Sequence, residues 1–337
     1  MPGTEQPWVR ALREREALCR RAPSAHNTQP WTLRYGPGAI TIGWSADREL
    51  PAGDPTRRDL HLALGAFVET CLTVAADAGL SVRAEIAVDT ARRTAARLLP
   101  ARAPHPTPFT STTVTDRTCA RGPHLPGRLT PSQLTSVRGA LTGPHTLFEL
   151  PARALTALAV RADRHLFGTA PVATELRAWL RLHPGHPRYR ADGLTYEALA
   201  LSRTEAAGLR AVLAPRPYAL LRRLGLARLL AGTQRGLLRH DGSVLVFTGP
   251  RDMGERDLVR AGQDLVRTWY ALTELGLAVH PLSQLIDNPD TAASLGALLP
   301  ADAGRVLAVF RAGRPAAMPA RSARLAEGTG AVGGVTP

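Results

Sequence analysis

The sequence predicts an α+β protein with an internal repeat. Apolar residues recur close to the 3.6-residue period over 59–78, and a second long helix is expected over 256–275. Continuous apolar runs at 243–248 and 305–311 are typical of buried strands. Long helices and buried strands within 337 residues indicate one large domain or two medium ones, each with a core.

Glycine spacing within the two long helices predicts the repeat. Gly65 and Gly79 lie fourteen residues apart, as do Gly262 and Gly276, and the two pairs are offset by 197 residues. The later glycine of each pair closes its helix and precedes an expected strand. Since amphipathic helices ending in glycine are common, coincidence is the alternative explanation.

The first part of the chain is predicted to alternate helices with short strands. Pro23 ends the first helix, because a residue before proline disfavours helical geometry, and Gly36-Pro37-Gly38 forms a hairpin turn. The expected elements are a helix over 8–19, strands over 31–35, 39–44 and 81–88, a segment over 91–99 that is either a short helix or the edge of a strand, and a proline-rich linker over 103–110.

The second part is predicted to contain more helix than the first. Its expected elements before residue 240 are helices over 130–141, 152–166 and 172–182, a strand over 146–150, and leucine- and arginine-rich helices over 195–240. The last of these have no counterpart in the first part, which suggests an insertion that covers a cleft as a lid. An extended segment over 278–285 follows the second long helix.

Composition excludes several classes of protein. Hydrophobic residues make up 44% and charged residues 21%, as in ordinary globular proteins, and no apolar run approaches the roughly 18 residues that span a membrane. The net charge is +14, and the sequence contains arginine but no lysine. The arginines are scattered along the chain, so we expect no specific nucleic-acid partner. The three cysteines lack metal-ligand spacing, and no signal peptide is recognised, so a cytoplasmic location is expected.

A proline-clamped loop carries the most specific pattern of the chain. Between Pro23 and Pro30 lie Ser24, Asn27 and Gln29, whose side chains can present rigid donors and acceptors to a flat polar ligand. The alternative interpretation is a helix end followed by an ordinary turn.

The phrase Ala-Pro-Ser-x-x-Asn-x-Gln-Pro-Trp over 22–31 resembles the signature of the nitroreductase superfamily, which are FMN-dependent oxidoreductases. The stretches 47–58 and 189–194 are similar to the tandem, double-length actinobacterial branch, the Acg-like proteins. Single-length nitroreductases are homodimers with FMN at the interface. The resemblance therefore implies two tandem repeats in an intramolecular pseudo-dimer, with antiparallel-rich sheets flanked by helices.

The resemblance also implies how the chain divides. A first nitroreductase-like half over 1–108 would supply the loop for the flavin ring, and a second half over 109–326 would supply arginines for the phosphate, with 195–240 as the lid. A tail over 327–337 is expected to be disordered. Because only the first half has the ring loop, one composite site should be complete.

The residues expected to bind the cofactor come from both halves. Arg117-x-Cys119-x-Arg121 stands where the family has Arg-x-Ser-x-Arg, so cysteine replaces one phosphate ligand. The complete expected set is Ser24, Asn27, Gln29, Arg117, Arg121, His280, Pro281, Leu282, Ser283, Arg321 and Arg324. Trp31 is a further candidate for the ring. His280 could instead be a structural histidine, and Arg324 could instead be a charge exposed to solvent. No catalytic acid or base is nominated. His26 is either a residue of the cleft or a residue of the turn.

The function implied by the resemblance is an FMN-dependent oxidoreductase that transfers hydride to or from a small molecule, with NADH or NADPH as a transient donor. The alternatives are a flavin-sequestering protein without turnover and a cofactor-free interaction protein on the same fold. No membrane partner is expected, and the protein would be a monomer or a homodimer.

Overall fold

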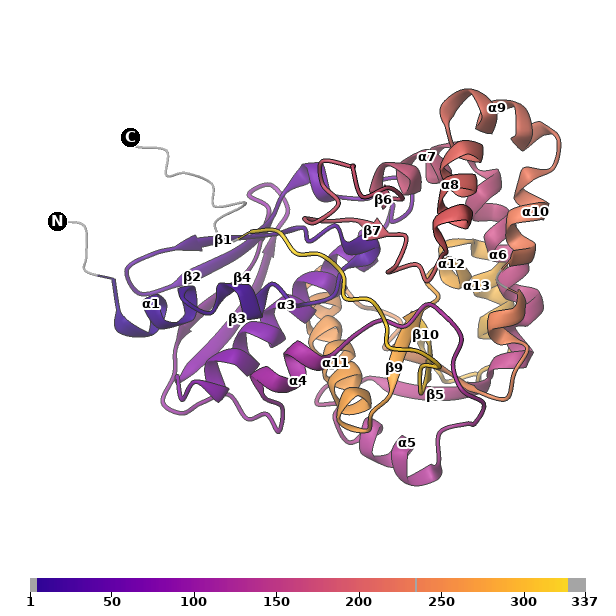
Figure 1. The fold of residues 1–337 in the computed structure, drawn as a ribbon. Coiled ribbons are helices and arrows are strands. Elements are labelled where there is room, and N and C mark those ends of the chain that lie inside the picture. Colours follow the sequence, from indigo (N-terminus) through magenta and orange to yellow (C-terminus); the bar gives the residue numbers. More distant parts are fainter. Residues whose placement is uncertain (1–4, 234, 327–337) are drawn as a thin grey trace.

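The computed structural model describes residues 5–233 and 235–326 and contains two four-stranded antiparallel sheets (Figure 1). The first sheet has the order β1 (Trp31–Tyr35), β2 (Ile40–Trp44), β4 (Thr94–Pro100) and β3 (Val82–Asp89). The second has the order β5 (Thr146–Pro151), β8 (Ser243–Gly249), β10 (Arg305–Gly313) and β9 (Ala278–Pro281).

The two sheets follow one topology. In each, the first strand pairs with the second, the second with the fourth and the fourth with the third. The second and third strands are joined by a 20-residue helix, which is α3 (Arg58–Asp77) in the first case and α11 (Glu255–Glu274) in the second. The predicted α+β fold with two tandem repeats is therefore confirmed.

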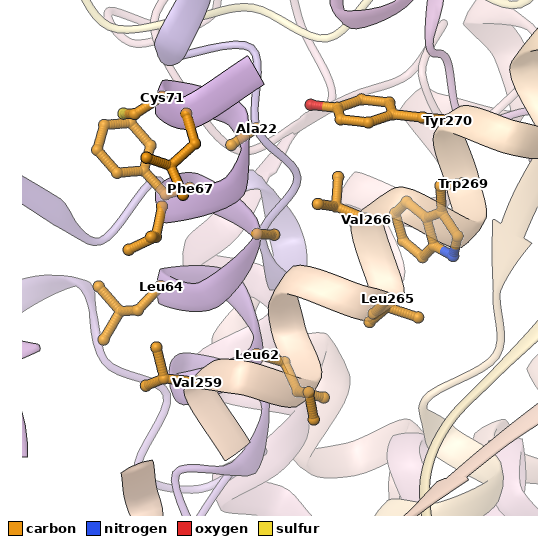
Figure 2. Close-up of a cluster of buried hydrophobic side chains, with 14 of the residues drawn as sticks. Ala22, Leu62, Leu64, Phe67, Cys71, Val259, Leu265, Val266, Trp269 and Tyr270 are labelled. Carbon is orange, nitrogen blue, oxygen red and sulfur yellow. The ribbon is translucent and has the colours of Figure 1, made fainter. Parts of the chain in front are cut away.

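The two long helices pack against each other at the repeat-related glycines. A Cβ on Gly65 would lie 1.8 Å from the backbone oxygen of Val259, and a Cβ on Gly262 would lie 2.2 Å from that of Leu62. Because Leu62 and Val259 each precede their glycine by three residues, the contact is the same from both sides, as in a twofold-symmetric dimer. The side chains around this crossing form one core shared by both repeats (Figure 2).

The remaining helices surround these two units. They are α1 (Pro7–Arg13), α2 (Glu16–Cys19), α4 (Ser111–Asp116), α5 (Pro131–Arg138), α6 (Thr156–Gly168), α7 (Ala170–Trp179), α8 (Arg203–Val212), α9 (Pro215–Arg223), α10 (Leu226–Thr233), α12 (Gln284–Asp287) and α13 (Pro289–Gly296). The 3-10 turns are η1 (Ala25–Asn27), η2 (Ala46–Arg48), η3 (Ala152–Leu155) and η4 (Arg235–Leu238), and a small parallel pair joins β6 (Leu180–Arg181) to β7 (Leu194–Thr195).

The structure decides one open alternative, corrects the bounds of the insertion and leaves the predicted tail untested. The segment over 91–99 is not a helix, because from Thr94 it forms β4, which lies inside the first sheet and pairs with β2 and β3. The segment without a counterpart in the first repeat spans 152–242 and not only 195–240. It lies between the paired strands β5 and β8, whereas the corresponding strands β1 and β2 are joined by residues 36–39 alone. The tail expected over 327–337 lies outside the described residues.

Helix α3 is long and apolar enough to cross a membrane by length and composition, the one such helix among the described residues. However, 89% of its most apolar window is buried inside the protein. Its apolarity is therefore explained by its place between the first sheet and α11.

The chain after β10 returns to the first repeat. In Figure 1 this segment runs from the second sheet back across the molecule toward β1. The backbone N–H of Leu325 donates to the side-chain oxygen of Gln29 at 2.9 Å, which ties the end of the described chain to the proline-clamped loop. This return brings C-terminal arginines to the N-terminal loop.

Candidate functional site

A cavity of about 630 Å³ lies between the two repeats. Its walls come from the loop after α2, from α3 and α11, from the segments 117–121 and 280–284, and from the returning segment 320–324. Both Asn27 and Arg121 line it, so the loop of the first repeat and the arginine segment of the second face one space.

The proline-clamped loop has an unusual backbone. His26, Asn27 and Gln29 all have positive φ values, of 47°, 54° and 51°, in a region that non-glycine residues rarely adopt. Such strain persists only where surrounding contacts hold it, and it often occurs at binding sites. The hydroxyl of Ser24 accepts from the backbone N–H of Gln29 at 2.9 Å and closes the turn.

The amide of Asn27 supplies part of the restraint. Its Nδ2 donates to the backbone oxygens of Gly193 at 3.1 Å and Ala323 at 3.0 Å, and its Oδ1 accepts from Nη1 of Arg324 at 3.0 Å. One side chain thus joins the loop to the segment before β7 and to the returning C-terminal segment.

The amide of Gln29 has the same kind of role. It is completely buried, does not line the cavity, and donates from Nε2 to the backbone oxygen of Ala191 at 2.9 Å. Trp31 is also absent from the cavity wall, because it is buried and stacks on Phe67 in the core. The sequence predicted ring contacts for these two residues, and the structure uses them for packing and for loop attachment.

Four arginines gather at one part of the cavity: Arg21, Arg117, Arg321 and Arg324. Nη2 of Arg117 donates to the backbone oxygen of Arg21 at 2.8 Å. Nε of Arg324 donates to the backbone oxygen of Arg20 at 2.7 Å. Arg321 lies 3.5 Å from the exposed Asp116, and no other carboxylate pairs with the cluster in the described chain.

The arginine cluster is short of negative charge. Burial, followed by repulsion from Arg117 and Arg21, lowers the pKa of Arg324 to about 9. Burial also lowers the pKa of Arg21, with Arg117 and Arg321 as neighbouring cations. The buried Nε atoms of Arg21 and Arg117 have no hydrogen-bond partner within the described residues. An anion placed here would satisfy these donors and offset the repulsion.

The other predicted positions are divided between the cavity and the core. Nη1 of Arg121 donates to the backbone oxygen of Ala198 at 3.2 Å while the residue lines the cavity. Pro281 and Ser283 also line it, whereas Leu282 belongs to a separate apolar core. His280 lines the cavity and is 5% exposed; burial, and then Arg311, hold its pKa well below its ordinary value, so it is neutral.

Several cavity residues were not predicted from the sequence. Arg21 was within reach of prediction, because it directly precedes the recognised motif. Asp163 of α6 and Asp287 of α12 carry no motif that marks them, and the fold alone brings them to the wall. The indole Nε1 of Trp269 is a further donor that is buried without a partner in the described part of the chain.

His26 faces the cavity from the loop. Burial lowers its pKa to about 4, an effect that Arg121 reinforces and Asp59 opposes. The imidazole is therefore neutral at physiological pH and can serve as a hydrogen-bonding group without charge.

Two curated proteins of Mycobacterium tuberculosis resemble part of this chain. They are named, provisionally, as the NAD(P)H nitroreductases Rv3131 of strain H37Rv and MT3217 of strain CDC 1551. Each is 36% identical over 77 residues, which cover 23% of this chain and 22% of the relative. The resemblance to nitroreductases is thus confirmed over the matched segment, which spans about a fifth of either relative. No family model matches the chain.

Solved nitroreductases resemble the structure more distantly. The FMN- and NADPH-dependent nitroreductase NfnB from Sphingopyxis sp. strain HMH has 18% identity and a TM-score of 0.36, and the match covers 61% of this chain and 88% of that chain. An FMN-bound nitroreductase of Bacteroides fragilis has 12% identity and a TM-score of 0.34 over 65% and 95%.

Proposed function

We propose that the protein is an FMN-dependent oxidoreductase of the nitroreductase type, which transfers hydride between the flavin and a small molecule. The observation that supports this most directly is the arginine cluster at the wall of a cavity of about 630 Å³, in which the Nε atoms of Arg21 and Arg117 have no hydrogen-bond partner among the described residues. Cavities of this size are usual for cofactors and small substrates. In this proposal the halves 1–108 and 109–326 build one composite site, and the chain belongs to the double-length branch.

The phosphate of FMN would be held by Arg21, Arg117 and Arg324. Arginine suits this role because its planar fork holds two phosphate oxygens, and the free Nε donors of the first two are available for it. The flavin ring would lie toward the loop that carries Ser24 and Asn27. Cys119 in place of a hydroxyl residue removes one hydrogen bond, and the additional Arg21 offsets that loss.

When bound, the flavin supplies the centre that accepts and donates hydride. The residues of the chain bind and orient it and exclude water. His280 and His26, both neutral, offer hydrogen-bonding nitrogens at the wall without adding a charge. NADH or NADPH would bind transiently over the ring as the electron donor.

The test is spectroscopic. The purified protein should carry a flavin spectrum, lose it on anaerobic addition of NADH or NADPH, and regain it with a nitroaromatic or quinone acceptor. Purified protein that neither retains FMN nor binds added FMN would overturn the proposal and leave the cofactor-free interaction protein as the alternative.

A second candidate function is flavin sequestration without turnover. Leu209 of α8 and Leu230 of α10 line the cavity, so helices of the insertion cover it. A closed cover would keep both donor and acceptor from the ring. Flavin that binds tightly but resists reduction by both nicotinamides would favour this function over catalysis.

A further inference from the structure

We propose that the wall of the cavity formed by α6 and α12 binds a cationic group, so that the substrate is a largely apolar small molecule with a protonated amine. This inference rests on the proposed function and specifies its substrate class. It starts from Asp163, which lies in the middle of α6 and lines the cavity.

The carboxylate of Asp163 is buried without sufficient partners. The residue is 2% exposed, its Oδ1 accepts only a long hydrogen bond from Nε2 of Gln284 at 3.4 Å, and its Oδ2 has no partner in the described residues. Leaving a buried carboxylate oxygen unsatisfied is costly. A donor on a bound molecule would complete its hydrogen bonding, and a charged donor would do so most strongly.

A second observation gives this wall its charge. The guanidinium of Arg58 is shared between Asp59, at 2.8 Å, and Asp287, at 2.7 Å, and both carboxylates line the cavity. Asp54 lies behind them and accepts from the backbone N–H of Leu60 at 2.9 Å. Asp54, Asp59 and Asp287 thus share one arginine, and burial together with the charge of Asp59 raises the pKa of Asp54 and of Asp287 to about 7. A cation at this wall would stabilise the charged forms of these carboxyl groups.

Helix α12 contacts both Asp163 and Arg58. Gln284, which contacts Asp163, begins this helix, and Asp287, which contacts Arg58, ends it. Aliphatic side chains, among them Leu62, Leu166 and Leu176, also line the cavity. The wall therefore suits an apolar body with one cationic group, in contrast to the arginine cluster, which suits an anion.

The experiment compares three nitroaromatic probes that differ in charge: 4-nitrobenzylamine, 4-nitrobenzyl alcohol and 4-nitrobenzoate. Their binding to the FMN-loaded protein is measured by equilibrium dialysis at pH 7. The wild type should bind the amine roughly 10- to 100-fold more tightly than the alcohol, and the benzoate most weakly. Equal affinities for the amine and the alcohol would overturn the proposal without any variant being made.

The variant Asp163→Asn keeps the shape of the side chain and removes its charge. It should reduce the preference for the amine to about threefold or less. The remaining preference would come from the neighbouring charged groups. Asp252→Asn, at an exposed position away from the cavity, should leave the preference unchanged. A preserved preference in a folded Asp163→Asn protein would contradict the role of Asp163.

The outcome is separable from that of the proposed function. Selective binding of the amine by a protein whose flavin resists reduction would keep the cationic site and reject the oxidoreductase. Reduction and reoxidation of the flavin, with no preference among the three probes, would keep the oxidoreductase and reject the cationic site.

Discussion

Oδ1 of Asn27 accepts a hydrogen bond from Nη1 of Arg324 at 3.0 Å, although 297 residues separate the two in sequence. The contact joins the loop that follows α2 to the segment that follows β10. It fixes the arginine of the second repeat beside the strained loop of the first. The proposed cofactor site is therefore assembled from the two ends of the chain.

Removal of both loop amides, by Asn27→Ala with Gln29→Ala, should release the C-terminal segment and lower the FMN content. The amides hold the backbone at Ala191, Gly193, Ala323 and Leu325, so their loss frees Arg324 from its position. Limited digestion with trypsin should cut at Arg321 and Arg324 sooner than in the wild type. Unchanged digestion and unchanged flavin content would contradict this role of the loop.

Arg117→Ala should weaken FMN binding about 10- to 100-fold and leave riboflavin binding nearly unchanged, because only FMN carries the phosphate. Fluorescence titration of the apoprotein with both flavins measures the difference. The control is Arg314→Ala, which removes an exposed arginine that does not line the cavity. Equal losses for the two flavins would argue against a phosphate contact.

Gly65→Ala should destabilise the protein by about 3 kcal/mol or more, since the new methyl group would collide with the backbone of α11. The matched control is Gly208→Ala in α8, where a Cβ meets no other atom. That change should stabilise the helix by about 0.5–1 kcal/mol. Chemical denaturation of both variants measures the difference, and similar stabilities would refute the close contact of the two repeats.

Glu69→Gln should cost about 3–5 kcal/mol of stability, because Glu69 of α3 pairs with Arg267 of α11 at 2.8 Å in a buried site. The glutamine keeps the shape of the side chain but leaves the arginine charge uncompensated. Glu85→Gln on the exposed face of β3 is the control, with an expected effect within about 0.5 kcal/mol. A loss no larger than in the control would mean that the pair is not buried in solution.

The contribution of His124 to stability should fall as the pH falls from 6.5 toward 4. Burial lowers the pKa of His124 to about 4 from an ordinary 6.5, so the unfolded chain takes up protons in this interval before the folded one does. His280 adds to the effect in the same direction. The free energy of unfolding at pH 7 and pH 5 measures it, and His124→Gln should flatten the dependence. A variant with the same pH dependence as the wild type would exclude His124 as a contributor.

A separate loss is expected at lower pH. Burial raises the pKa of Glu69, but the hydrogen bonds and charges of His105 and Arg267 outweigh it and hold this pKa below its ordinary 4.5. The stabilisation is present above pH 4.5 and is lost as the pH falls through the lower folded value. Glu69→Gln should therefore remove part of the acid sensitivity of the wild type.

By itself, the sequence determined the long helices, the buried strands, the repeat of Gly65 and Gly262, and the loop that resembles the nitroreductase motif. These features depend on local periodicity and spacing, which a sequence records directly. Only the tertiary structure decided that Gln29 and Trp31 are buried outside the cavity wall, that β4 lies inside its sheet, and that Asp163 and Asp287 both line the cavity. Such contacts join residues far apart in the chain, where packing and burial select among side chains that look alike in sequence.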